Sequence, residues 1–286
     1  MNLISFKKEN FHSLNRIKEE FNTCLKQYYK EKKRILPWRE NINSYYIFVS
    51  EFMLQQTQVS RVINYFNSFI EKFPTFKALS QAPQSAILES WSGLGYNRRA
   101  MYLHQGAKII TEQYKEFIPD SVKILKKIKG IGEYTASALV TYSYNRPTLF
   151  VETNIRTVCF SIFEQYFSEE KISDKQLIEL IEQIIDKENP REWYYAMMDL
   201  GTELKKILPK AHLKKSSSYQ KQSLFVGSMR AIRGKIIKIL TNNNQQKVIR
   251  KELELLCNDQ RADSCITNLI KEGLIEEQED FLYLRK

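Results

Sequence analysis

The chain has 286 residues, of which 44 are Lys or Arg and 33 are Asp or Glu, so its formal net charge is +11. With 43% hydrophobic and 27% charged residues, the composition is typical of a globular protein and excludes a disordered or collagen-like chain. No run approaches the roughly 20 apolar residues that a membrane span needs, and the charged N-terminus does not resemble a secretory signal. Four scattered cysteines are too few for a disulfide framework. We therefore expect an intracellular, cytoplasmic protein with no membrane association.

Helical spacing of apolar residues recurs along the first two hundred residues, and prolines fall between the periodic segments, where they would end helices. This pattern predicts an all-α domain over residues 1–213. The predicted helices are Leu14–Tyr28, Val59–Phe73, Met101–Tyr114, Thr135–Tyr144, Thr153–Phe163, Asp174–Asp186 and Trp193–Leu204. Within them we expect Phe66, Phe69, Phe73 and Trp193 to be core residues.

The C-terminal end has a different pattern. Residues 214–228 are polar and rich in serine, which predicts a linker. In residues 229–286, helical patterns over Ala231–Leu240, Lys247–Cys257 and Ala262–Glu272 precede an acidic turn flanked by Leu274–Ile275 and Phe281–Leu284. Three helices and a hairpin predict a small winged-helix-like α+β domain.

Basic residues are concentrated in one stretch. Glu203–Lys238 holds ten Lys or Arg and one acid, whereas Thr241–Lys286 holds seven basic and nine acidic residues. A polyanion is a plausible partner for the basic stretch, and a solvated linker is the alternative reading. Because the C-terminal segment is net acidic, a contact with another protein or packing within the chain is at least as plausible there as DNA binding.

A glycine-rich turn stands before a helix in the segment LKKIKGIGEYTASA, Leu125–Ala138. Gly130 and Gly132 would allow a tight turn and expose amide N–H groups that can bind a phosphate. The pattern predicts a helix-hairpin-helix, with one helix over Ser121–Lys127 and the next beginning at Tyr134. Such a hairpin grips a DNA phosphate without reading a base.

Two glutamates are candidates for acid and charge-stabilising chemistry. Glu51 has apolar neighbours, so we expect its carboxyl to be partly buried with a raised pKa, as a general acid requires. Glu152 lies twenty residues after Gly132. One carboxyl could protonate a leaving base while the other, ionised, steadies an oxocarbenium-like sugar. From the residues alone, a solvated or helix-capping role is favoured over catalysis for each glutamate.

Five motifs in order resemble the adenine DNA glycosylases of the helix-hairpin-helix superfamily, the MutY type. They are LPWR (36–39), SEFMLQQTQV (50–59), GLGY (93–96), GIGEYTA (130–136) and AMMDLG (196–201). The resemblance implies two helical modules with the active site in the cleft between them, and hydrolytic removal of adenine from duplex DNA after extrusion of the base. The LQQTQ block is particular to the adenine branch.

The resemblance also implies roles for individual residues. Glu51 corresponds to the acid that protonates the purine, Glu152 to the catalytic carboxylate, and Asn154 to an asparagine that orders the site. Tyr134 corresponds to a tyrosine that supports the cationic sugar, where the endonuclease III branch has a Schiff-base lysine, so strong lyase activity is not expected. Further expected site residues are Arg39 and Asp199 near the base pocket, Gln56 and Tyr96 as wedges into DNA, and Gln55, Gly130, Gly132, Lys205, Lys215 and Lys221 as DNA contacts.

The chain departs from the family pattern in three ways. The catalytic aspartate is Glu152, and one extra methylene moves a carboxylate by about 1 Å, a misplacement that can cost ~100-fold in rate. The usual iron–sulfur cysteines fall on Lys205, His212, Lys215 and Lys221, so we expect no cluster and no other cofactor or metal. A domain that senses oxidised guanine is not recognisable, and the winged-helix-like segment stands in its place.

We therefore expect a monomeric, monofunctional DNA glycosylase of base excision repair, acting on adenine opposite guanine or 8-oxoguanine in double-stranded DNA. In a bacterium it would be associated with the nucleoid. The alternatives are a related glycosylase for mismatched thymine or uracil, and a non-catalytic DNA-binding protein. The winged-helix-like segment could bind a protein partner.

Overall fold

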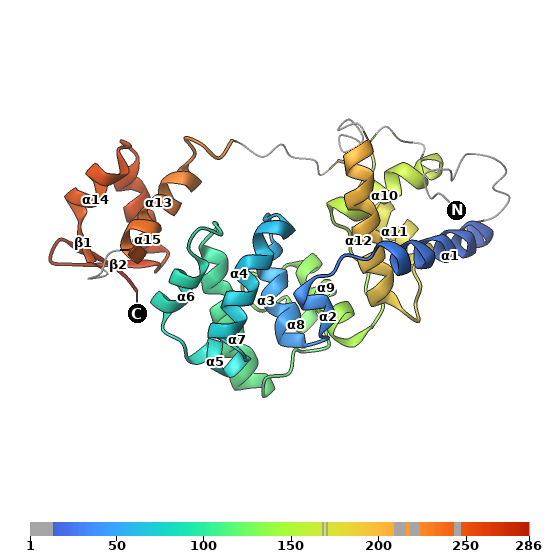
Figure 1. The fold of residues 1–286 in the computed structure, drawn as a ribbon, viewed down its shortest axis with the longest axis horizontal. Helices are drawn as coiled ribbons and strands as arrows, with labels where there is room; N and C mark the ends of the chain where they lie inside the picture. The colour runs from blue at the N-terminus through green and yellow to red at the C-terminus, as the bar shows by residue number, and fades with distance from the viewer. Residues whose placement is uncertain are drawn as a thin grey trace. The chain divides into compact units, whose positions relative to one another are not determined.

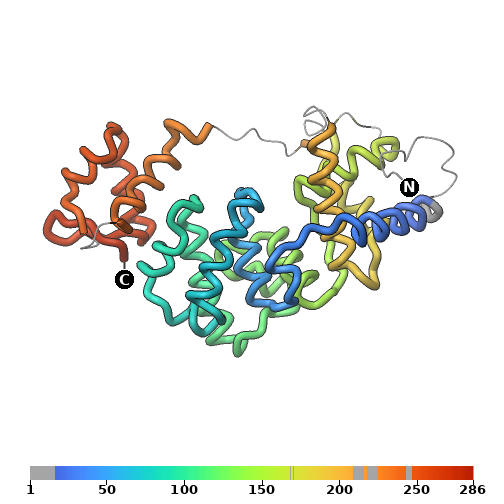
Figure 2. The backbone as a smooth tube through the Cα atoms, viewed as in Figure 1, coloured from blue at the N-terminus to red at the C-terminus, as the bar shows by residue number. Residues whose placement is uncertain are grey.

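The structure is a computed structural model that describes residues 14–167, 169, 171–208, 216–217, 224–242 and 247–285. Helices dominate it, and a small antiparallel sheet lies near the C-terminus. The chain folds into two compact units (Figures 1 and 2). Unit 1 comprises residues 1–36, 120–123 and 132–221, and unit 2 comprises residues 37–119, 124–131 and 222–286. Among the described helices, none combines the length and the hydropathy that crossing a bilayer needs.

Unit 1 is built around one long helix, α12. Helices α1, α9 and α10 all pack on it, and Figure 1 shows α1, α10, α11 and α12 grouped together. Local sequence explains the ends of the helices: Ser173 and Gln176 form a capping box at the start of α11, and Pro190 lies in the first turn of α12. The helices are α1 (Leu14–Lys32), α9 (Glu133–Tyr144), α10 (Thr153–Ile162), α11 (Asp174–Ile184) and α12 (Pro190–Ile207), with a short 3₁₀ turn at Glu164–Tyr166.

Gly201 allows α12 to press closely on α10. A Cβ atom at this position would lie 2.2 Å from the backbone oxygen of Asn154, a separation that no side chain could tolerate. Above and below this contact the two helices pack with ordinary side chains, and the stacked rings of Phe150 and Tyr194, 3.8 Å apart at their centroids, extend the core. The close approach brings the last turns of α12 to the N-terminal end of α10.

Unit 2 contains one unusually apolar helix, α3. Every residue of α3 from Ile47 to Met53 is buried, including Glu51, and the apolar stripe Val62, Phe66 and Phe69 of α4 packs against it. The first helices are α2 (Pro37–Glu40), α3 (Ser44–Leu54), α4 (Val59–Lys72), α5 (Phe76–Gln81), α6 (Gln84–Trp91) and α7 (Arg98–Tyr114). The short α8 (Val122–Leu125), whose first two residues belong to unit 1, leads into the hairpin.

The C-terminal segment of unit 2 contains three helices and a three-stranded antiparallel sheet. Strand β3 is central, in the order β1-β3-β2, with Val248 opposite Leu282 and Ile275 opposite Leu284. The central strand β3 packs against α13. The elements are α13 (Met229–Asn242), β1 (Lys247–Ile249), α14 (Arg250–Cys257), α15 (Ala262–Lys271), β2 (Ile275–Gln278) and β3 (Phe281–Leu284).

The C-terminal segment packs on the rest of unit 2 through a polar contact. Glu272 accepts hydrogen bonds from Arg233 of α13 and from Arg98 at the start of α7, and the side chain of Gln84 donates to the carbonyl of Gly273 at 2.6 Å. Burial raises the pKa of Glu272, but the hydrogen bonds from Arg98 and Arg233 outweigh it and hold that pKa below its usual range. The contact between the C-terminal segment and α7 therefore depends on an ionised Glu272 paired with Arg98.

The predicted all-helical fold with a small C-terminal sheet is confirmed. All seven helices predicted in the first two hundred residues form, and Phe66, Phe69, Phe73 and Trp193 are core residues. One boundary was wrong: residues Lys247–Ile249 were predicted to be helical, but they pair with β3 as strand β1. The β-branched Val248 and Ile249 suit an extended ladder, and tertiary pairing overrides the short helical pattern. The winged-helix assignment stays a prediction.

Candidate active site

The predicted hairpin forms a tight turn before α9. Gly130 has φ +88°, and a Cβ atom there would lie 2.6 Å from the Cβ atom of Tyr102, so only glycine fits. The side-chain amide of Gln55, at the end of α3, donates to the carbonyl of Gly130 at 3.3 Å. Within unit 2, a hydrogen bond thus connects the LQQTQ block (54–58) to the hairpin turn.

The start of α9 belongs to unit 1 and carries the predicted sugar-stabilising residue. Gly132 is the N-cap of α9, is exposed and has no side chain to cap the helix, and a helix N-terminus of this kind can bind an anion. Tyr134, in the first turn, lies edge-on to Phe150 with 5.5 Å between ring centroids. Its ring is therefore held by the core of unit 1 while the side chain remains partly accessible.

The carboxylate of Glu152 caps helix α10. Its Oε1 atom accepts from the backbone N–H groups of Asn154 at 2.6 Å and Ile155 at 2.9 Å. Its Oε2 atom accepts from the side-chain amide of Asn154 at 3.2 Å. Three donors thus fix the carboxylate in one orientation, at the positive end of a helix dipole. The helix-capping role of Glu152 that the sequence left open is confirmed. The cap holds the carboxylate in one orientation before any substrate binds.

Lys205 adds a positive charge to this cluster. Its Nζ atom, in the last turn of α12, donates to Oδ1 of Asn154 at 2.6 Å. Burial raises the pKa of the Glu152 carboxyl, and the charge of Lys205 and the two backbone amides oppose that rise. Burial likewise lowers the pKa of Lys205, and the charge of Glu152 opposes this. The two charges therefore stabilise each other.

Glu51 lies in the middle of α3 in unit 2, with only 6% of its surface exposed. The buried setting expected from its apolar neighbours is confirmed: Phe48, Phe52 and Met53 are fully buried around it. The raised pKa expected for its carboxyl stays a prediction. The proton-donor role itself stays a prediction.

The predicted wedge residues occupy strained backbone positions in unit 2. Gln56, in the turn after α3, is exposed with φ 54°, and Tyr96, in the GLGY loop, has φ 51°. Left-handed backbone is uncommon for non-glycine residues and is over-represented at functional sites. The hydroxyl of Tyr96 accepts a hydrogen bond from Arg230 of α13 at 2.6 Å, so the C-terminal segment reaches this loop.

Arg99 holds both wedge turns in place, although no sequence motif marks it. Its buried guanidinium donates to the carbonyls of Phe52 and Met53 at 2.9 Å and of Gln55 at 2.5 Å, which end α3. It also donates to the hydroxyl of Thr57 and the carbonyl of Gly95, both at 3.0 Å. Burial lowers the pKa of Arg99 to about 10, which leaves it charged at neutral pH.

The two expected base-pocket residues lie in different units. Asp199 of α12 is almost fully buried and accepts from the backbone N–H of Arg34 at 2.9 Å and from its Nε at 2.6 Å. Both carboxylate oxygens thus brace the segment that follows α1. Arg39 is partly buried in α2. The base-pocket role of each stays a prediction.

The residues present do not fit an iron–sulfur cluster. Lys205 is described, and its ammonium, which donates to Asn154, has no lone pair for iron. His212, Lys215 and Lys221 lie outside the described residues. Within the described ranges, no three His, Cys, Asp or Glu side chains gather to hold a metal ion. The four cysteines are spread over α1, α10, α14 and α15.

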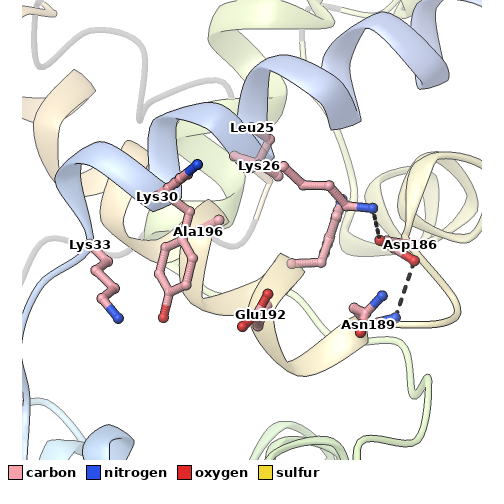
Figure 3. Close-up of a pocket in the computed structure, with 10 residues that line it drawn as sticks. Leu25, Lys26, Lys30, Lys33, Asp186, Asn189, Glu192 and Ala196 are labelled. Carbon is pink, nitrogen blue, oxygen red and sulfur yellow. Dashed lines mark hydrogen bonds and ion pairs between the residues drawn. The ribbon is translucent and has the colours of Figure 1, made fainter.

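A hollow of about 350 Å³ lies elsewhere in unit 1, between α1, α12 and the loop before α12 (Figure 3). Lys26 donates to Asp186 at its rim at 2.8 Å, and the backbone N–H of Asn189 donates to the same carboxylate at 3.1 Å. None of the predicted site residues lines it. Asp186, one of the two carboxylates that line the hollow, is already paired with Lys26. We therefore assign the hollow no catalytic role.

The hairpin, the capped carboxylate on the following helix and the buried glutamate define a helix-hairpin-helix protein. The family profile described as "HhH-GPD superfamily base excision DNA repair protein" matches residues 49–187 of this chain. Solved structures of the same fold include a thermostable thymine-DNA glycosylase, with a TM-score of 0.57 and 23% identity over 65% of this chain and 87% of that one.

Curated relatives carry the name adenine DNA glycosylase, as the motifs predicted. The Mycolicibacterium smegmatis protein is 29% identical over 90% of this chain and 92% of its own length. The protein from Buchnera aphidicola subsp. Baizongia pistaciae is 34% identical over 63% of this chain, and the human protein 32% identical over 63%. The chain spans about half of the Buchnera relative, 51%, and 35% of the human one.

Arg99→Met should lower the stability of unit 2 markedly. The change leaves buried carbonyls of α3 without their donor, and each unsatisfied group costs about 1–3 kcal/mol, so we expect a loss of about 3 kcal/mol or more. The neighbouring Arg98 is half-exposed and pairs with Glu272, so Arg98→Met is the matched control with an expected loss of about 1 kcal/mol. Thermal melts of both variants test this, and equal melting temperatures would contradict it.

Proposed function

We propose that the chain is a monofunctional DNA glycosylase that hydrolyses the N-glycosidic bond of adenine in double-stranded DNA, opposite guanine or 8-oxoguanine, and acts as a monomer. The observation that supports this most strongly is the fixed carboxylate of Glu152. A glutamate in place of the aspartate expected from the resemblance still receives three hydrogen bonds, from two backbone N–H groups and the Asn154 amide. That arrangement argues against a chain that has lost its chemistry.

In the proposed reaction, Glu51 donates its proton to the purine as the bond between the sugar and the base breaks. The bonding electrons leave with the base, and positive charge develops on the sugar ring. The ionised Glu152, held at the N-terminus of α10, stabilises this oxocarbenium-like sugar. Water then adds to the anomeric carbon, and Glu51 takes up the proton that the water loses.

Tyr134 supports the monofunctional assignment. A lysine at this position could attack the sugar and form a Schiff base, but a phenol of ordinary reactivity at neutral pH does not. Its ring is held against Phe150, which suits a supporting role beside the cationic sugar. The DNA product should therefore be an intact strand with an abasic site, which breaks only after alkali.

The experiment that tests the function is a panel of duplexes incubated with the full-length protein, followed by alkali. Each duplex carries adenine, thymine or uracil as the target, opposite guanine or 8-oxoguanine. We expect cleavage at adenine, with no strand break before alkali. Cleavage at thymine or uracil in place of adenine would support the related-glycosylase alternative, and binding without any base release would support a non-catalytic protein.

We also propose that the enzyme works without an iron–sulfur cluster. The described ligand position is occupied by Lys205, which is engaged with Asn154. The purified protein should therefore be colourless and should keep its activity and melting temperature after treatment with an iron chelator. Metal analysis and the visible absorption spectrum test this. Stoichiometric iron with labile sulfide would contradict it.

The C-terminal segment, in this proposal, supports the GLGY loop rather than reading the opposite base. Arg230 donates to the hydroxyl of Tyr96 at 2.6 Å, and its guanidinium lies 5.6 Å from the centre of the ring. A hydrogen bond from a charged donor contributes about 1.5–3 kcal/mol, so Arg230→Met should slow base release about 10-fold or more, on A·G and A·8-oxoguanine alike.

The matched control is Arg261→Met, because Arg261 lies in the same segment but pairs with the neighbouring Asp259 at 2.8 Å. Single-turnover rates on the two duplexes are compared for both variants. A selective loss of the 8-oxoguanine preference in Arg230→Met would show instead that the segment reads the opposite base.

A further inference from the structure

Lys205 and Asn154 are 51 residues apart in sequence, yet they form one of the shortest side-chain contacts in unit 1. Nζ of Lys205 lies 2.6 Å from Oδ1 of Asn154. Gly201, one turn earlier on α12, makes the contact possible because any larger residue would collide with the backbone of Asn154. Lys205 therefore contacts α10 at Asn154, two residues after the N-cap residue Glu152.

The chemistry of lysine decides how the Asn154 amide is oriented. A lysine ammonium only donates hydrogen bonds, so the amide must present its oxygen to Lys205. The NH₂ group then points the other way and donates to Oε2 of Glu152 at 3.2 Å. With the amide reversed, its oxygen would face the carboxylate, and two acceptors would repel each other.

We infer that Lys205 is a positioning residue, which locks the amide of Asn154 and through it the second oxygen of the Glu152 carboxylate. The inference rests on the proposed function, in which that carboxylate stabilises the cationic sugar. It also gives Lys205 a role other than the DNA contact expected from the sequence.

The neighbouring lysine shows that this contact is particular to Lys205. Lys206 is exposed and pairs with Glu203 on its own helix at 2.8 Å. Lys205 is partly buried, and the nearby Arg156 pairs with Asp174 at 2.7 Å. Lys206→Met is therefore the matched control: it removes a lysine from the same turn without touching Asn154.

The test uses the full chain with Lys205→Met, Lys205→Arg, Asn154→Ala, the double variant Lys205→Met with Asn154→Ala, and Lys206→Met. Single-turnover base release is measured on an A·G duplex, and affinity on a duplex with a non-hydrolysable adenosine analogue over a range of salt. We expect Lys205→Met to slow release by up to roughly 100-fold, because a misplacement of about 1 Å in a catalytic group can cost that much. Affinity and its salt dependence should stay unchanged, Lys205→Arg should restore most of the rate, and Lys206→Met should match the wild type.

The double variant tests most directly whether Lys205 acts through Asn154. If Lys205 acts through Asn154, removing the lysine from Asn154→Ala should have no further effect on the rate. Additive losses would overturn the inference, and so would an unchanged rate in Lys205→Met. A weaker affinity with a flatter salt dependence would mean that Lys205 binds phosphate instead.

Melting temperatures separate this inference from the proposed function. Coupling between Lys205 and Asn154 should appear in the melts of the single and double variants without any substrate. If the wild type releases no adenine but the coupling is present, the proposed function fails while the contact stands. If the melts show no coupling, the positioning role fails whatever the substrate.

Discussion

Glu51→Gln should abolish base release while DNA binding persists. The amide keeps the shape of the buried side chain in α3 but cannot donate a proton, and general acid catalysis contributes roughly 10²- to 10⁴-fold to a rate. We expect a single-turnover loss in this range on an A·G duplex. Because α3 is almost wholly buried, the near-isosteric change is the one that tests chemistry rather than packing.

The control for this variant is Glu71→Gln, which changes an exposed glutamate on the neighbouring helix α4. Its rate should equal that of the wild type. Melting temperature and affinity for the non-hydrolysable duplex are measured for both variants. A Glu51→Gln protein that is folded, binds DNA and still cleaves within tenfold of the wild-type rate would show that Glu51 is not the proton donor.

Glu152→Gln is the variant with the second largest expected loss. The amide oxygen can still accept from the N–H groups of Asn154 and Ile155, so the cap of α10 survives. The negative charge that stabilises the sugar is lost, and the new NH₂ group would face the NH₂ group of Asn154. Removing one electrostatic stabiliser of a transition state costs about 10²- to 10³-fold, and we expect at least that.

Two comparisons make this prediction specific. Glu152→Asp keeps the charge and a good capping residue, so it should retain more activity than Glu152→Gln. Glu182→Gln, on the exposed side of α11, should have no effect. If Glu152→Gln and Glu152→Asp were equally active, the charge of Glu152 would have no role in the reaction.

The pH profile follows from the same carboxylate. Base release needs Glu152 ionised, so activity is present above its pKa and lost as the pH falls through it. Because burial raises this pKa from its ordinary value of 4.5, with Lys205 opposing the rise, the acid limb of the wild-type profile should lie above 4.5. Glu152→Gln should lack this limb.

Much of the fold could be predicted because its helices are amphipathic. The stripe of α4 and the capping residues of α11 leave clear sequence signals, and the motif spacing identified the hairpin. Helix α3 left no such signal, since apolar residues surround it on every side and periodicity disappears when a helix is wholly buried. Strand β1 is only three residues long, and its pairing with β3 is a tertiary effect.

The candidate site was predicted in its residue types but not in its contacts. The chemistry of Glu51 and Glu152 follows from the motifs, whereas the capping geometry of Glu152 depends on backbone angles that no spacing reveals. Arg99 resembles any solvated arginine in an amphipathic helix, and four of its five acceptors lie 42 to 47 residues away in sequence, at the end of α3 and in the turn after it. The pairing of Lys205 with Asn154 likewise needs the close approach at Gly201.

The most direct measurement is the identity of the base that the protein sets free. A duplex with a single adenine opposite guanine is incubated with an excess of the full-length protein, and the small-molecule fraction is separated and identified by its mass. The proposed function predicts one free adenine per duplex, with the sugar–phosphate strand intact until alkali is added. No free adenine from a protein that binds the duplex, or release of a different base, would contradict it.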